Sequence, residues 1–391
     1  MIPLMKNAFI EEFETKKALS EFIMKAPRLS MDSQCLAFEK KFAAYQKRKH
    51  AVLFNSGGSA NLALLQSMKN LGHLHDGDIT GFSALTWSTN VMPIIQMSLQ
   101  PAAIDCSPET INITAELLKK FIAKHKIKCL FITNALGFTG DLPAIRDICS
   151  AEKILLLEDN CESLGTELPE GKAGNFSAAS TFSFFVAHHM STIEGGMVCT
   201  DDDEIAEMLK IVRANGWDRN LSSDQQHKWR KKFAINSEFQ GKYTFYDLGF
   251  NFRPTEITGF LGIYQMQFLE KNIEKREKNY LYLESFVKNN QDLQMINHAH
   301  ISRLSNFSFP VICKTPELRQ KYILQFSGAG VEIRPMIAGN MQKQPFYEKY
   351  PYIKNELPGT EKIDSCGFYF GNYPELTETD LEVLSSCLKK Y

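Results

Sequence analysis

Residues 128–159 of this chain read KCLFITNALGFTGDLPAIRDICSAEKILLLED. The apolar runs at 128–133 and 154–157 have the length of buried strands, and LPAIRDICSAEK between them has helical spacing. A strand, a helix and a second buried strand form the unit of a parallel sheet that is covered by helices on both faces. This stretch therefore predicts an α/β fold.

The same alternation continues on both sides of this stretch. Further apolar runs predict strands at 51–54, 78–82, 102–104 and 197–200. Helical spacing is found at 55–72, 86–100 and 116–126. Strands that alternate with such helices indicate a mostly parallel sheet. Ligands of these sheets bind at the carboxyl ends of the strands, so residues directly after the apolar runs are the first candidates for a site.

The pattern changes from about Asn251. Residues 254–290 predict one long helix, or two helices end to end, that cross to a smaller domain. The chain beyond them mixes strands and helices, which is typical of an α+β lobe. We therefore expect two domains. Residues 1–255 would form an N-terminal amphipathic helix and a large domain, and residues 256–391 a linking helix and a small domain.

Composition narrows the class of protein. The chain has 391 residues, with 44 Lys and Arg against 45 Asp and Glu, and a formal net charge of −1. Nucleic-acid binding needs a surplus of basic side chains, so nucleic acid is not an expected partner. No run of about 18 apolar residues predicts a membrane span, and acidic residues interrupt the apolar N-terminus, unlike a signal peptide. We expect a cytoplasmic protein without a membrane partner.

Two further composition features bear on the site. The nine cysteines are scattered and form neither CxC nor CxxC, so buried reduced thiols are expected and neither a zinc nor an iron–sulfur site is predicted. Residues 220–233 are polar and basic, and are expected to form a loop or flap, or else a solvated surface insertion.

Two candidate features directly follow predicted strands. The sequence NSGGSA at 55–60 opens a helix, where backbone N–H groups and the helix N-terminus suit a phosphate. An ordinary tight turn is the alternative. Asp159 follows the strand at 154–157, where a carboxylate can pair with a protonated pyridine nitrogen. The alternative for this residue is a helix cap.

Two more candidates carry rings. Trp87 follows another predicted strand and could stack on a planar ligand, with a core tryptophan as the alternative. His188 and His189 are adjacent in an apolar segment that ends in a diglycine. Histidine titrates near neutrality and suits proton transfer, although a structural role is the alternative for such a pair.

In order and spacing, these features resemble four motifs of the DegT/DnrJ/EryC1/StrS family of fold-type I sugar aminotransferases, which use pyridoxal phosphate (PLP). The similar stretches are NSGGSANL at 55–62, LLLEDNCESLG at 155–165, FSFFVAHHMSTIEGGMVCTDD at 182–202 and LGFNFRPTEITGFLGIYQ at 248–265. The resemblance runs from about residue 30 to the C-terminus. It implies a large domain with a mixed, mostly parallel sheet, a smaller C-terminal α+β domain, and a homodimer with shared active sites.

The resemblance also implies roles for single residues. Asp159 would pair with the pyridinium nitrogen, Glu162 would lie near the ring hydroxyl, and Trp87 would stack on the ring. The implied ligands of the cofactor phosphate are Gly58, Ser59, Ser183 and, from the neighbouring subunit, Asn251. Arg219 and Arg334 are candidates for a sugar-nucleotide phosphate or a donor carboxylate, with a surface or interface ion pair as the alternative.

One departure from the family decides the expected chemistry. The aminotransferase pattern has a lysine five residues after Ser183 and six before Glu194, and this chain has His188 there. No lysine occurs between Lys172 and Lys210. Imidazole cannot form the Schiff base that lysine forms with the cofactor aldehyde, so the cofactor is expected to be held non-covalently. His188 is the expected base, and His189 is its rival.

A histidine at this place resembles an offshoot of the family, the 4-keto-6-deoxysugar 3-dehydratases. The absence of a CxC favours its metal-free branch, which implies a GDP-linked 4-keto-6-deoxymannose as substrate and glutamate as amino donor for pyridoxamine phosphate (PMP), in colitose and O-antigen lipopolysaccharide synthesis. A CDP-linked or other nucleotide sugar, and a non-catalytic family member, remain alternatives. Asn215 stands where the relatives usually have histidine, which leaves open whether this position has a role.

Overall fold

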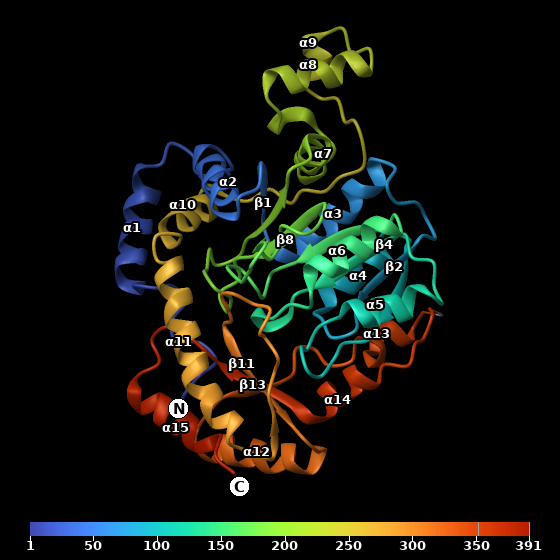
Figure 1. The fold of residues 1–391 in the computed structure, drawn as a ribbon. Helices are drawn as coiled ribbons and strands as arrows, with labels where there is room; N and C mark the ends of the chain where they lie inside the picture. The colour runs from blue at the N-terminus through green and yellow to red at the C-terminus, as the bar shows by residue number, and fades with distance from the viewer. Residues whose placement is uncertain (351, 391) are drawn as a thin grey trace.

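The computed structural model describes residues 1–350 and 352–390, and a seven-stranded sheet lies at its centre (Figure 1). The strands follow one another in the order β1 (His50–Phe54), β9 (Gly196–Thr200), β8 (Ala179–Ser183), β5 (Leu155–Asp159), β4 (Cys129–Thr133), β2 (Ile79–Ser83) and β3 (Gln100–Ile104). Strand β9 is antiparallel to both of its neighbours, and the pairs from β8 to β3 are parallel. This confirms the predicted α/β fold with a mixed, mostly parallel sheet.

Strand β4 shows why this sheet is covered on both faces. Its five residues are all buried, and successive side chains point to opposite faces. Leu130 and Ile132 belong to the same apolar cluster as α5 and α6, whereas Cys129 and Phe131 belong to that of α3, α4 and α7. These helices are α3 (Gly57–Asn70), α4 (Ser88–Gln96), α5 (Ala115–Ile122), α6 (Leu142–Ala151) and α7 (Asp203–Arg213).

The C-terminal part begins with two helices end to end, α10 (Glu256–Gln265) and α11 (Leu269–Lys288), the second of the two predicted arrangements. Helix α11 runs from the large sheet to a four-stranded antiparallel sheet (Figure 1). The order there is β10 (Leu293–Gln294), β11 (Ser308–Cys313), β13 (Gly367–Gly371) and β12 (Ile333–Pro335). Helices α12 (Pro316–Gly328), α14 (Pro358–Cys366) and α15 (Glu378–Cys387) pack with this sheet. Helix α13 (Pro345–Glu348) packs instead on the large sheet, because its Tyr347 lies in the same apolar cluster as Phe82 of β2.

The basic segment predicted as a loop or flap stands away from the sheet, at the top of Figure 1. Within residues 220–233 the structure has α8 (Ser223–Lys232), with the short helix η2 (Asp218–Asn220) before it and α9 (Glu238–Gly241) after it. Most of it is helix rather than loop, because Ser222 and Gln225 form a capping box that starts α8.

The N-terminal helix forms as predicted. Helix α1 (Glu12–Lys25) is followed by α2 (Ser33–Gln46), and both lie beside α10. Over the residues that the structure describes, no helix is long and apolar enough to cross a membrane.

Candidate active site

The glycine-rich turn brings the N-terminus of α3 against the end of β8. Ser56 caps the helix, because its side chain accepts a hydrogen bond from the Ser59 N–H at 3.0 Å. A Cβ atom on Gly57 would come within 2.7 Å of the Ser183 Cβ, so no larger residue fits without a shift. Gly58 and Ser59 follow Gly57 in the first turn of α3, and Gly57 is the residue that lies against Ser183. The partial positive charge of a helix N-terminus makes this place suited to an anion.

Asp159 ends β5 with its carboxylate buried and hydrogen-bonded on both oxygens. Oδ2 accepts from Asn61 Nδ2 at 2.8 Å and Asn90 Nδ2 at 3.1 Å, and Oδ1 accepts from the Cys161 N–H at 2.8 Å. Burial raises the pKa of Asp159, and the hydrogen bonds from Cys161 and Asn61 act against that rise. The side chain does not serve as a cap for a following helix, which was the alternative for it.

Asn61 and Asn90 were missed by sequence reasoning. Asn90 is held in place by Thr133, whose hydroxyl donates to the Asn90 Oδ1 at 2.7 Å, and Thr133 in turn lies 2.6 Å from the hydroxyl of Thr86. The available signal was a polar side chain inside each of the two apolar helices that follow the candidate strands.

Glu162 is buried close to Asp159. Its Oε2 accepts a hydrogen bond from the Leu136 N–H at 2.9 Å. Burial, with the charge of Asp159 adding to it, raises the pKa of Glu162 to about 8. The side chain is therefore mostly protonated at neutral pH and can donate a hydrogen bond.

Arg334 lies on β12 of the small sheet, opposite Tyr369 on β13. Burial first, and then the charge of Glu162, raises the pKa of Tyr369 to about 12. Tyr369 is therefore near enough to Glu162 for the charge of that carboxylate to act on its hydroxyl. The Arg334 guanidinium is half-exposed and pairs with Glu332.

The two adjacent histidines have different surroundings. His189 is 1% exposed, and its Nε2 lies 3.0 Å from the backbone oxygen of Ser305. His188 is only partly buried, between the rings of Phe185 and Phe307, with centroids 5.8 and 5.3 Å away. Its Nδ1 is buried without a hydrogen-bond partner in the described protein. His189 is thus held by the fold, and His188 has the freer ring.

His188 departs from the near-neutral titration expected of a histidine. Burial, with the charge of Arg276 adding to it, lowers the pKa of His188 to about 4. The imidazole is therefore neutral at pH 7 and can accept a proton.

Trp87 is 57% exposed and lies at the N-cap position of α4, beyond the end of β2. The alternative of a core tryptophan is therefore wrong. One face of the indole is available to a planar ligand.

Arg219 and Asn251 lie together in a surface hollow of about 350 Å³, which Arg28 and Arg253 also line. The Arg219 guanidinium lies 5.3 Å from the Trp217 ring. No hydrogen bond among the described residues joins this hollow to Asp159 or His188. The structure therefore does not bring these two predicted residues into the site around Asp159 within one chain.

The departure at Asn215 has a conformational explanation. Its φ angle is 60°, in the left-handed region, and its N–H donates to the Phe250 oxygen at 2.8 Å. Asparagine and histidine are both enriched among the residues that adopt this conformation. The backbone thus accounts for a choice between these two residue types.

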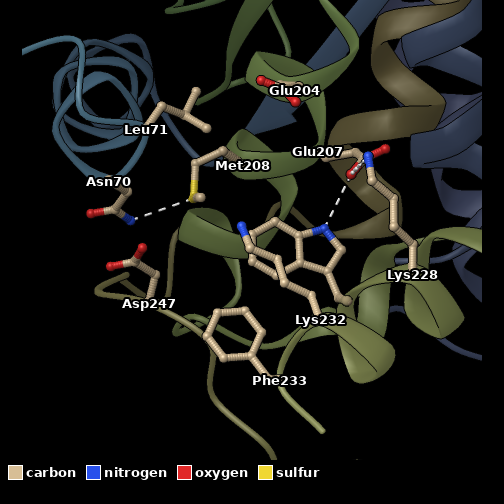
Figure 2. Close-up of a pocket in the computed structure, with 10 residues that line it drawn as sticks. Asn70, Leu71, Glu204, Glu207, Met208, Lys228, Lys232, Phe233 and Asp247 are labelled. Atoms are coloured by element: carbon tan, nitrogen blue, oxygen red, sulfur yellow. Dashed lines mark hydrogen bonds and ion pairs between the residues drawn. The ribbon is translucent and has the colours of Figure 1, made fainter.

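A second hollow, of about 240 Å³, lies where α3, α7 and α8 meet (Figure 2). The indole N–H of Trp229 donates to Glu207 Oε2 at 3.1 Å. None of the sequence-predicted site residues lines this hollow. The contact fastens the base of the projecting segment to α7.

The residues around Asp159 fit PLP or PMP. A helix N-terminus with neighbouring serines suits the phosphate, Asp159 is a buried acid for a ring nitrogen, and Trp87 offers an exposed ring. A buried oxygen, Asn61 Oδ1, has no partner among the described residues and is free to accept a hydrogen bond.

Over residues 1–350 and 352–390, no group of three or more His, Cys, Asp or Glu side chains is arranged to hold a metal ion.

Comparison with known proteins defines the class. The model of the DegT/DnrJ/EryC1/StrS aminotransferase family matches residues 10–389, so the chain belongs to this family. It is 33% identical over 374 residues to the GDP-4-keto-6-deoxy-D-mannose 3-dehydratase of Yersinia pseudotuberculosis, covering 94% of each chain.

Two crystal structures of GDP-4-keto-6-deoxymannose-3-dehydratase are similar over the whole chain. One contains a trapped PLP–glutamate geminal diamine and has a TM-score of 0.89 with 30% identity. The other is a histidine-to-asparagine mutant with bound GDP-perosamine, with a TM-score of 0.90 and 30% identity. Each comparison covers 100% of both chains.

Proposed function

We propose that this protein is a PLP- and PMP-dependent lyase that removes the C3 hydroxyl of GDP-4-keto-6-deoxymannose, with glutamate as amino donor. The proposal rests mainly on the identity and the protonation state of residue 188. A neutral imidazole occupies the position of the family's lysine, while the cradle for the cofactor is intact. The names of the full-length relatives and the nucleotide sugar bound in one of them support the same substrate class.

When bound, PMP would supply an amine that condenses with the sugar 4-keto group, and a ring that takes up the electron pair freed by deprotonation of C4′ and returns it as the C3 hydroxyl leaves. Asp159 holds a proton on the ring nitrogen, and that opposite charge in turn favours its own carboxylate form. Gly58, Ser59 and Ser183 bind the phosphate. Trp87 covers one face of the ring and limits access of water.

His188 takes the proton from the cofactor carbon C4′. Since Nδ1 is buried, Nε2 is the nitrogen that receives the proton. An imidazole cannot recapture the cofactor covalently as a lysine does, so elimination is not interrupted by release of an amino sugar.

The lowered pKa of His188 predicts the pH dependence of dehydration. A base acts in its neutral form, so the rate falls as pH drops through the pKa of His188. Because burial lowers this pKa from 6.5 to about 4, the acid limb of the rate profile should have its midpoint well below pH 6.5. Initial rates between pH 4 and 8, with circular dichroism at each pH to verify folding, measure it. A midpoint at or above 6.5 would contradict a desolvated base.

Glu162 is proposed to donate its proton to the ring hydroxyl oxygen. Glu162→Ala should weaken PMP binding about tenfold or more, since a hydrogen bond to a charged group contributes about 1.5–3 kcal/mol. Glu162→Gln keeps an N–H donor of similar shape and should stay within about threefold of the parent protein. Titration of the apoprotein with PMP, followed by absorbance, compares the two. If both variants weakened PMP binding equally, Glu162 would not act as a hydrogen-bond donor to the ring hydroxyl.

A homodimer would account for the remaining predicted residues. We propose that Asn251 and Arg219 reach the cofactor phosphate and the sugar nucleotide of the neighbouring subunit, since within one chain they lie apart from Asp159. Arg334, on β12 beside Tyr369, is the proposed ligand of the glutamate carboxylate. Residues 1–255 would then carry the cofactor, and residues 256–391 would close one side of the site.

A substrate panel tests the function. The protein with PLP and glutamate should form 2-oxoglutarate and ammonia with GDP-4-keto-6-deoxymannose in preference to CDP- or dTDP-linked 4-keto-6-deoxy sugars. A preference for a sugar linked to another nucleotide would support the proposed reaction but contradict GDP as the nucleotide of the substrate. Failure of glutamate to convert bound PLP to PMP, together with no turnover of any sugar, would favour a non-catalytic role. We place the reaction in the cytoplasm, in the supply of colitose for O-antigen lipopolysaccharide.

A further inference from the structure

Arg276, on α11, is buried beside the two histidines. Its side chain is 5% exposed, Nη1 donates to the His189 backbone oxygen at 3.0 Å, and Nη2 donates to the His188 backbone oxygen at 3.5 Å. Its Nε is buried without a partner in the described protein. No carboxylate among the described residues lies within ion-pair distance, and Glu375 acts on the guanidinium only from further away. Burying the charge of an arginine without a carboxylate partner costs free energy. The two hydrogen bonds to backbone oxygens therefore indicate that Arg276 has a specific role.

The segment that these contacts hold is anchored from both sides. On one side, the fork of Arg276 holds two consecutive carbonyl groups. On the other, the His189 ring bonds to the Ser305 oxygen. Arg276 is itself fixed, because Asn372 donates to its backbone oxygen at 2.9 Å. The turn between β8 and β9 is thereby tied to the C-terminal part of the chain.

We propose that Arg276 is a positioning residue for His188, fixing the backbone from which the imidazole reaches the cofactor carbon and providing a positive charge behind it. The inference rests on the proposed role of His188 as base. A planar guanidinium suits this task because it offers several donors in a rigid fork, whereas an ammonium offers a point charge. A displacement of about 1 Å in a catalytic group can cost about 10²-fold in rate.

The positive charge of Arg276 is a second way in which this residue can act on His188, beside its hydrogen bonds to the backbone. The charged group that acts on the His188 imidazole is Arg276, from α11, and the neighbouring titratable group is His189, whose own pKa the charge of His188 lowers. After burial, the charge of Arg276 further lowers the pKa of His188. Removal of this charge should therefore raise that pKa and move the acid limb of the rate profile to higher pH.

Three variants separate the effect of the two guanidinium hydrogen bonds from the effect of the positive charge. Arg276→Gln keeps a donor and removes the charge, and should lower kcat about 10²-fold with KM nearly unchanged and the acid limb shifted upward. Arg276→Lys keeps the charge and loses the fork, and should lower kcat without moving the acid limb. Arg319→Gln is the matched control. Arg319 also donates to two consecutive carbonyl groups, those of Asp364 and Ser365 at 3.2 Å each, but on α12.

A readout that does not depend on turnover uses the apoprotein. Histidine labelled at Cε1 gives one NMR signal per ring, and the signal that His188→Asn removes belongs to His188. Its titration midpoint should rise in Arg276→Gln and stay in place in Arg276→Lys and Arg319→Gln. If Arg276→Gln does not fold, Arg276→Lys carries the test through its kcat.

The outcomes are distinguishable. Normal kcat and an unchanged His188 titration in both Arg276 variants would overturn the inference while the proposed function stands. A fully active His188→Asn variant would overturn the proposed function itself. A loss of activity in Arg319→Gln equal to that in Arg276→Gln would show a general loss of stability, and would also overturn the positioning role.

Discussion

His188→Asn should lower the rate of sugar dehydration about 10²–10⁴-fold, the contribution of a general base. Asparagine fits beside Phe185 and Phe307 but cannot accept a proton in this pH range. The variant should still bind PMP and the nucleotide sugar, because the phosphate turn and Asp159 are unchanged. Rapid mixing of the PMP form with sugar, followed by absorbance, separates binding from the proton transfer.

His189→Asn is the control for this result. His189 is buried and bonded to Ser305, so its replacement should lower the free energy of unfolding by about 1–3 kcal/mol. Dehydration should continue within about tenfold of the parent rate, since the ring that accepts the proton remains. The reverse outcome, an active His188→Asn and an inactive His189→Asn, would move the base to the second histidine.

His188→Lys should restore a covalent link to PLP. The position matches that of the lysine in the related aminotransferases, and a lysine amine reacts with the cofactor aldehyde. Borohydride treatment of the PLP form should leave a stable adduct on residue 188, located by peptide mass spectrometry. Some transfer of the amino group to the sugar should accompany it.

Two controls define this experiment. The parent protein should give no reduced adduct on any lysine of the site, and His188→Gln should give none either. An adduct in the parent protein would contradict non-covalent binding. A failure of His188→Lys to form an adduct would show that residue 188 does not face the cofactor aldehyde.

The predictable part of the fold follows from local patterns. Strands such as 129–133 are apolar except at their last residue and are followed by helices, so the α/β class and the mostly parallel sheet follow from periodicity. The segment 220–233 was harder to predict because α8 has no continuous apolar stripe. Its capping box, Ser222 with Gln225, was a local signal that composition concealed.

The candidate site also has a part that the sequence predicts and a part that it does not. Asp159 ends a strand and the turn at 55–60 directly follows one, so sequence alone could place them at one edge of the sheet. Asn61, Asn90 and Arg276 act through contacts between elements far apart in the chain, which no local pattern records. The pKa values of His188 and Glu162 could not be foreseen either, because burial in the folded protein causes both shifts.

The balance of products tests the central claim most directly. Removing the C3 hydroxyl takes up two electrons, and oxidation of glutamate to 2-oxoglutarate and ammonia supplies them. The protein with PLP, glutamate and GDP-4-keto-6-deoxymannose should therefore form 2-oxoglutarate, ammonia and 3-deoxy sugar in equal amounts. An ordinary aminotransferase would form 2-oxoglutarate and an equal amount of 4-amino sugar without ammonia, and that result would contradict the account.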